Sequence, residues 1–135
     1  MTAAAPSSSP SSLSLGPLLQ ISMNAHDIRR ATAFYRDQLR VPFLFEVPPK
    51  MAFFDCGGVR LMLSLPENAQ YDHPGSILYF RVADIQEAHA ALVARGVPFV
   101  TEPHLIARMP DYELWLADFK DSEGNTLALM AEVRQ

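Results

Sequence analysis

The chain offers few of the side chains that commonly carry out catalysis or bind metals. Its four histidines, His26, His73, His89 and His104, have spacings that match no zinc-binding signature. It contains no Gly-x-Ser-x-Gly nucleophile motif, phosphate-binding glycine loop or Cys-x-x-Cys pair. Cys56 is the single cysteine, and we expect it to be a small buried side chain at the end of a strand. These residues therefore indicate none of the common nucleophilic, phosphate-binding or zinc chemistries.

Polar and apolar side chains alternate along four segments that are predicted to be strands. In residues 18–24, Gln20, Ser22 and Asn24 share one face, because successive side chains of a strand point to opposite sides of its sheet. The other face of this strand is apolar, and we expect it to meet a helix. In residues 59–64, 77–82 and 126–132 the same alternation places on the corresponding face Arg60, Met62, Ile77, Tyr79, Arg81, Ala128 and Met130.

This predicted surface has the composition of a small-molecule pocket, in which apolar walls carry a few polar groups. Arg60 and Arg81 would bind a carboxylate or stack on a planar ring, unless they lie at strand ends and point into water. Four aromatic residues would add ring surface if they are not part of the core, namely Phe53, Phe54, Tyr112 and Trp115.

The chain also contains an internal repeat. The pattern Asp-Ile-x-x-Ala-x-Ala begins at Asp27 and again at Asp84, whereas Val-Pro-Phe begins at Val41 and again at Val97. The two spacings differ by one residue, which we explain by one residue of slip within a helix-to-strand turn. The copies lie too far apart for a solenoid, whose period is roughly 20–50 residues. Two half-domains related by duplication are the better interpretation.

Each half has the same predicted order of elements, a strand, a helix and three more strands. Asp27 and Asp84 can cap the helices, and Pro42 and Pro98 prevent those helices from continuing. Gly57-Gly58 predicts a hairpin turn in the first half, and residues 121–125 predict one in the second. The predicted class is α+β, with modules at about 18–65 and 76–132 inside a domain of residues 18–135.

Composition excludes several classes of protein. Hydrophobic residues make up 49% and charged residues 19% of the 135 residues, which is typical of one folded domain. The net charge of −4 and the absence of a basic stripe argue against nucleic acid or an anionic membrane as partner. One cysteine fits a reducing compartment, so we expect a cytoplasmic protein. Residues 1–17, rich in Ala, Ser and Pro, are predicted to be a disordered tail.

Two segments of the chain resemble the vicinal-oxygen-chelate superfamily. The first is Asp27-Ile28-x-x-Ala31-x-x-Phe34-Tyr35-x-x-x-Leu39, which has an echo at Asp84, and the second is the closing segment from Phe119 to Leu127. This superfamily includes glyoxalase I, bleomycin-resistance proteins and extradiol dioxygenases. The resemblance covers about residues 18–132, although Ser122 stands where the family usually has proline. It implies two tandem βαβββ modules that form an open, cup-shaped mixed sheet with helices on the outer face. It also implies a homodimer, because members often build the cup from two chains.

The resemblance further implies where a divalent metal would bind. Metal-using members supply one ligand from the first strand and one from the last strand of each module. Alignment to the motifs places these four positions at Gln20, Met62, Ile77 and Ala128. Only Gln20 is a plausible ligand for a hard divalent cation. The sequence therefore predicts neither a metal nor a cofactor.

Three functional hypotheses follow. The first is a metal-free binding protein that holds an apolar or aromatic ligand, which can be anionic, in the cup. The second is a glyoxalase-like or dioxygenase-like metalloenzyme with non-standard ligands, for which the substitutes would be Glu46, Glu102, Glu113 and His104. Of these, His104 is expected in a loop at residues 103–112 that in this family can reach over the cup. The third is a degenerate domain that contacts other proteins.

Overall fold

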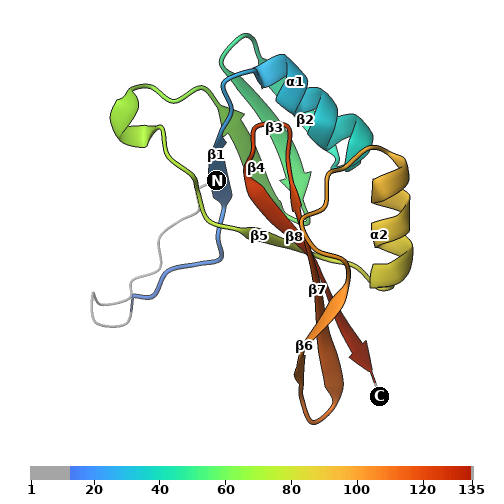
Figure 1. The fold of residues 1–135 in the computed structure, drawn as a ribbon. Coiled ribbons are helices and arrows are strands. Elements are labelled where there is room, and N and C mark those ends of the chain that lie inside the picture. Colours follow the sequence, from blue (N-terminus) through green and yellow to red (C-terminus); the bar gives the residue numbers. More distant parts are fainter. Residues whose placement is uncertain (1–12, 135) are drawn as a thin grey trace.

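The computed structural model describes residues 13–134. Most of the predicted tail, residues 1–12, lies outside the described residues, and residues 13–17 form no helix or strand. In residues 20–134 the chain runs twice through strand, helix and three strands (Figure 1). The α+β class and the two tandem βαβββ modules are thereby confirmed.

The first module forms one mixed four-stranded sheet in the order β1-β4-β3-β2. Strand β1 pairs with β4 in parallel, and the other neighbours are antiparallel. Its elements are β1 (Gln20–Asn24), α1 (Ile28–Ala33), the helical turn η2 (Phe34–Gln38), β2 (Phe43–Val47), β3 (Met51–Cys56) and β4 (Val59–Ser64). A short 3-10 turn, η3 (Ala69–Tyr71), lies in the connection to the second module.

The second module repeats this topology in the order β5-β8-β7-β6. Its elements are β5 (Leu78–Arg81), α2 (Ile85–Ala94), β6 (His104–Arg108), β7 (Tyr112–Lys120) and β8 (Thr126–Arg134). The strand after Pro98 begins only at His104, so the expected loop at 103–112 is in fact strand β6 and the hairpin into β7. The prediction of a loop was wrong because residues 104–108 pair in antiparallel fashion with residues 113–116 of β7. Phe99, next to Pro98, makes only an isolated bridge with Phe119.

The local signals of the sequence act as predicted at the helix starts and at the first hairpin. Asp27 accepts a hydrogen bond from the Arg30 amide at 3.0 Å, and Asp84 accepts one from the Glu87 amide at 3.1 Å. Gly57 and Gly58 have φ angles of +66° and +100°, which residues with a side chain rarely adopt. These two glycines form the tight turn between β3 and β4.

The one-residue difference within the repeat lies in η2, which is helical, and not in the turn between helix and strand where the sequence placed it. The Leu39 amide donates to the Phe34 carbonyl at 3.0 Å, a bond that spans five residues and defines a π turn. A π turn accommodates one additional residue in a helix without breaking it. For this reason the distance in sequence between the two Val-Pro-Phe motifs is one residue shorter than the distance between the two capping aspartates.

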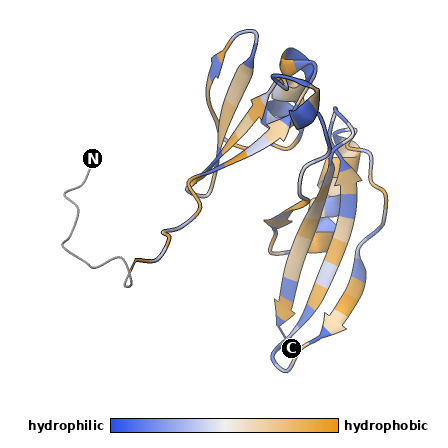
Figure 2. Ribbon diagram, turned by 90° about the vertical axis from the view of Figure 1, so that its left-hand side faces the viewer, coloured by the Kyte–Doolittle hydropathy of each residue, from blue (hydrophilic) through white to orange (hydrophobic). Residues whose placement is uncertain are grey.

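The core lies between each sheet and its helix and continues from one module to the other. Helix α1 packs on β3 and β4, and α2 packs on β7 and β8. The largest fully buried side chains come from both modules: Tyr35, Phe54, Leu61, Leu63, Phe119 and Leu127. Figure 2 shows the two sheets as separate blades with apolar and polar residues mixed along their strands. None of the helices in the described part is long or apolar enough to span a membrane.

Candidate functional site

The sheet face opposite α1 carries the polar side chains that alternation predicted. Met23, Leu61 and Leu63 are buried on the helix side, whereas Gln20 is exposed and Arg60 half-buried on the other. Parallel pairing places Gln20 beside Arg60 and Ser22 beside Met62. We call this surface the cup face of the first module.

Gln20, Arg60 and Met62 contact one another on this face. The Arg60 Nε donates to the Gln20 Oε1 at 2.7 Å, and the Gln20 Nε2 approaches the Met62 Sδ at 3.9 Å. The amide oxygen of Gln20 therefore already accepts a bond from a cationic group. An arginine in that place repels a second cation, so this contact opposes metal binding at Gln20.

Aromatic rings extend the same face toward the edge of the sheet. Phe45 and Phe53 are cross-strand partners, and their rings stack with centroids 4.5 Å apart. The Arg60 guanidinium lies over the Phe53 ring, 5.8 Å from its centroid. A flat aromatic surface beside a guanidinium suits a planar or anionic molecule.

A cavity of about 460 Å³ lies at one end of this face, beneath the connection between the modules. The predicted residues Ser22, Asn24 and Met62 line it. Further lining residues, outside the ten predicted ones, are Lys50, Met51, Ser64, Glu67 and His73. Alternation along residues 59–64 also puts Ser64 on this face, and the hairpin register would have added Met51, its cross-strand partner. Nothing in the sequence indicated that the connection covers the face, where the Asn24 side chain donates to the His73 carbonyl at 3.2 Å.

The remaining predicted residues belong to the second module and do not join this cavity. Ile77 lies just before β5 and is 46% exposed, and Tyr79 is 51% exposed. Arg81 pairs with Glu132 at 3.4 Å, and Met130 is half-buried. Ala128 is fully buried, so it offers no surface to a ligand in this arrangement. Its cross-strand partners are Tyr79 and Asp118, both with larger side chains than its methyl group.

The ten predicted residues are therefore divided. Arg60, Ile77, Tyr79 and Arg81 line a second cavity, which lies between the two modules, whereas Gln20, Ala128 and Met130 line neither cavity. A single cup built from all ten residues is not present within the described part of one chain.

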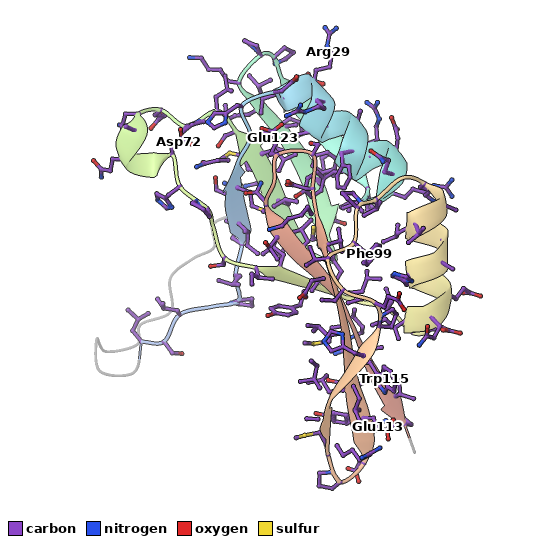
Figure 3. The ribbon with its side chains drawn as sticks, viewed as in Figure 1. Arg29, Asp72, Phe99, Glu113, Trp115 and Glu123 are labelled. Atoms are coloured by element: carbon purple, nitrogen blue, oxygen red, sulfur yellow. The ribbon has the colours of Figure 1, made fainter. Side chains whose placement is uncertain are left out.

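The substitute ligands considered from the sequence do not gather into a metal-binding cluster within the described residues. Glu113 binds Arg108 and the Trp115 indole near the far end of β7, where Figure 3 labels both Glu113 and Trp115. The His104 ring contacts the Glu102 carbonyl at 2.8 Å. Within residues 13–134, no group of three or more His, Cys, Asp or Glu side chains could hold a metal ion. Burial raises the pKa of the Cys56 thiol, with a further contribution from Asp55, so this thiol is a poor nucleophile at neutral pH.

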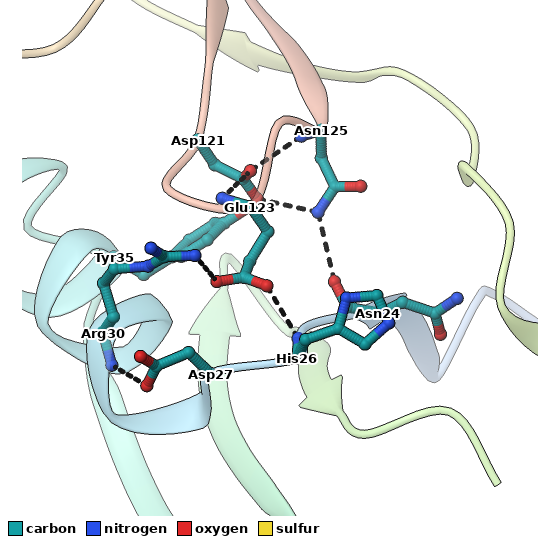
Figure 4. Close-up of polar contacts among 8 residues, drawn as sticks. All are labelled: Asn24, His26, Asp27, Arg30, Tyr35, Asp121, Glu123 and Asn125. Atoms are coloured by element: carbon teal, nitrogen blue, oxygen red, sulfur yellow. Dashed lines mark hydrogen bonds and ion pairs between the residues drawn. The ribbon is translucent and has the colours of Figure 1, made fainter.

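The β7–β8 hairpin joins the modules through a buried polar network that we call the hairpin clamp (Figure 4). Asp121, nearly fully buried, accepts hydrogen bonds from the Tyr35 hydroxyl at 2.7 Å and from the amides of Glu123 and Asn125 at 2.8 Å. Glu123 accepts from the His26 amide at 2.7 Å and pairs with Arg30 at 2.8 Å. Burial, followed by the charge and hydrogen bond of Asp121, raises the pKa of Tyr35 well above its usual value.

Comparison with known proteins identifies the family. The model of the glyoxalase/bleomycin resistance protein/dioxygenase superfamily matches residues 18–129. The chain belongs to this superfamily. No curated protein matches the chain.

Several solved structures share the fold. A lactoylglutathione lyase from Agrobacterium tumefaciens is 23% identical with a TM-score of 0.67, and the match covers 87% of this chain and 94% of that one. A superfamily member from Sphaerobacter thermophilus is 24% identical with a TM-score of 0.72, covering 87% and 98%. A virulence protein from Salmonella typhimurium is 15% identical with a TM-score of 0.72, covering 90% and 100%. At these identities the likeness concerns the fold alone.

The superfamily's divalent metal does not fit the residues of this chain. Of the four positions that the resemblance implies, Gln20 is held by Arg60, and Ile77 carries no donor atom. Ala128 is buried and also carries no side-chain donor, and the Met62 thioether prefers soft metals. This donor set lacks the imidazole and carboxylate ligands that hold zinc or iron in proteins.

Proposed function

We propose that this superfamily member is a metal-independent binding protein for a small apolar or aromatic molecule, which can be anionic. The observation that carries the proposal is the hydrogen bond from Arg60 to Gln20, because it places a fixed cation where the superfamily's metal would bind. The Arg60 guanidinium also lies over the Phe53 ring. At the place where the superfamily binds its metal, the guanidinium and the ring together form a flat surface that suits a planar molecule.

Ligand binding is assigned to the cup face of the first module. The stacked pair Phe45 and Phe53 supplies apolar area, and Arg60 supplies positive charge. The adjoining cavity of about 460 Å³ lies within the roughly 300–1,000 Å³ of small-molecule sites. Methionines at its wall, Met51 and Met62, are flexible and adapt to ligands of varied shape.

We propose further that a second copy of the chain completes the cup. Strand β2 lies at the edge of its sheet and exposes Phe43, Leu44, Phe45 and Val47. An exposed apolar edge strand favours association with another chain. A homodimer would be two-fold symmetric and would bring the same patch of both copies together. Sedimentation equilibrium of the full chain tests this step directly, with a monomer as the contradicting result.

The decisive experiment combines metal and ligand titrations. We expect no stoichiometric binding of Zn²⁺, Ni²⁺, Mn²⁺ or Fe²⁺, measured by elemental analysis and calorimetry. We expect 2-naphthoate to bind, and Arg60→Gln to weaken its binding about tenfold through loss of a charged hydrogen bond. Arg108→Gln is the matched control, because Arg108 lies on β6 of the other module and pairs with Glu113. One tightly held metal ion per chain would overturn the proposal and direct attention to glyoxalase-type or dioxygenase-type activity.

A further inference from the structure

The internal repeat shows that the two helices fill their modules differently. Counting from the capping residues Asp27 and Asp84, Ala91 occupies the position of Phe34 and Leu92 that of Tyr35. Phe34 and Tyr35 are buried in the core beneath their helix. An alanine and a leucine fill much less volume, so α2 leaves space that its counterpart occupies.

The β7–β8 and β3–β4 hairpins also differ, in the length of their turns and in the side chains that these carry. The five-residue turn between β7 and β8 reaches the first module, where Asp121 closes over the Tyr35 hydroxyl. The corresponding turn between β3 and β4 has only Gly57 and Gly58, which carry no side chains. The hydrogen bond between Tyr35 and Asp121 therefore has no equivalent at α2 within the described residues.

A cavity of about 910 Å³ lies at this place, between α2 and β5 of the second module and the β3–β4 hairpin of the first. We call it the inter-module cavity. Its apolar wall includes Phe80, Val82 and Ala88, all of which are only half-buried. Their counterparts Met23, Ala25 and Ala31 are fully or almost fully buried. The wall thus consists of core-facing side chains that remain partly exposed, whereas their counterparts in the first module are covered.

The charges around this cavity favour an anion. Four arginines line it, Arg40, Arg60, Arg81 and Arg95, against a single acidic residue, Asp55, although the chain as a whole carries −4. Arg60 donates to Gln20, Arg81 pairs with Glu132, and Arg95 donates to the Gln38 carbonyl. Among residues 13–134, no hydrogen bond or ion pair engages the Arg40 side chain. A free guanidinium beside an apolar wall is suited to the head group of an amphipathic anion.

The backbone at Arg40 carries a second, independent indication. Its φ angle is +59°, in the left-handed region that disfavours residues with a side chain. The equivalent residue in the second module is Gly96, with φ +85°, which adopts this conformation without strain. A strained arginine where the repeat has glycine indicates that the side chain at this position has a function.

We propose that the inter-module cavity binds an alkyl carboxylate, whose chain packs against β5 and α2 and whose carboxylate pairs with Arg40. This site differs from the cup face of the first module, because its apolar wall comes from the helix side of β5, from α2 and from the chain that follows η2. Arg60 borders both sites. Ile77 and Tyr79, both exposed, stand at its wall and add apolar area for the chain of the ligand.

The test is calorimetric titration of the full chain with decanoate, with decanol and decylammonium as neutral and cationic probes of the same length. We expect decanoate to bind most tightly. Arg40→Asn removes the charge but tolerates the left-handed backbone, and we expect it to weaken decanoate binding about tenfold and to leave decanol binding unchanged. Arg40→Lys keeps the charge and should restore most of the affinity. Arg29→Ala is the control, because Figure 3 shows Arg29 pointing away from the molecule on α1.

Filling the cavity provides the second arm. Ala91→Phe restores the side chain found at Phe34, and we expect it to abolish decanoate binding without lowering the unfolding temperature. Ala90→Phe is the matched control, because Ala90 is exposed on the same helix. Phe53→Leu, which changes a cup-face residue that does not line the inter-module cavity, should leave decanoate binding intact. Equal affinity for decanoate and decanol, or decanoate binding that survives Ala91→Phe, would overturn the proposal while leaving that for the cup face standing.

Discussion

Replacement of Asp121 by alanine should be among the most destabilising single changes in the chain. Its carboxylate accepts four hydrogen bonds, from the Tyr35 hydroxyl, the backbone amides of Glu123 and Asn125, and the Asn125 side chain at 2.9 Å. Tyr35 is fully buried, so its hydroxyl would lose its carboxylate partner without gaining access to water. An unsatisfied buried donor costs about 1–3 kcal/mol. We therefore expect Asp121→Ala to lower the free energy of unfolding by about 3–5 kcal/mol.

A double-mutant cycle with Tyr35→Phe isolates the central bond. Tyr35→Phe alone should cost about 1–2 kcal/mol, because Asp121 keeps its other three donors. The two changes together should cost less than the sum of each alone, by about 1 kcal/mol or more, since they remove the same contact. Urea unfolding followed by circular dichroism measures all four proteins, with Asp111→Ala, an exposed aspartate in the β6–β7 hairpin, as control. A loss below about 1 kcal/mol for Asp121→Ala, or strict additivity in the cycle, would refute the role assigned to the hairpin clamp.

Two further predictions concern pH and helix caps. Because the pKa of Tyr35 is raised in the folded protein, the unfolded chain loses this proton first, so stability should fall as pH rises above about 10. Tyr35→Phe should flatten that decline in urea titrations between pH 9 and 11.5, and an unchanged slope would contradict the assignment. Asp27→Ala and Asp84→Ala should each cost about 1 kcal/mol, because each carboxylate accepts an amide bond at the start of its helix. Asp27→Asn and Asp84→Asn should retain most of that stability in the same unfolding assay, whereas an equal loss would assign the effect to charge.

Much of the fold could be predicted because its signals are local. The alternation of Gln20, Ser22 and Asn24 with apolar neighbours determined which face of β1 meets the helix, and Met23 is buried as expected. The one-residue difference in the repeat was visible in the sequence, but it was assigned to the turn between helix and strand, whereas the structure has it in the π turn after Ala33. These signals need only the periodicity of strands and helices, so one sequence is sufficient.

The candidate sites were harder to predict because they depend on how the modules pack. Alternation assigned Ala128 to the open face, but depth below the surface depends on the size of its neighbours, and the methyl group is fully buried. Ile77 and Ser22 were grouped in one cup, yet they line different cavities. The relative position of two modules is a tertiary property that neither strand periodicity nor turn residues encode.

The two copies of the module have diverged in opposite directions at equivalent positions. In the first, a large side chain at Tyr35 meets a long hairpin that carries Asp121, and the contact is sealed. In the second, Leu92 faces a hairpin of two glycines, and a cavity remains. An unfilled apolar interior costs stability, whereas the sealed side supplies a buried network of charged hydrogen bonds. The two modules therefore share one core, in which the hairpin clamp closes one side and the inter-module cavity lies on the other.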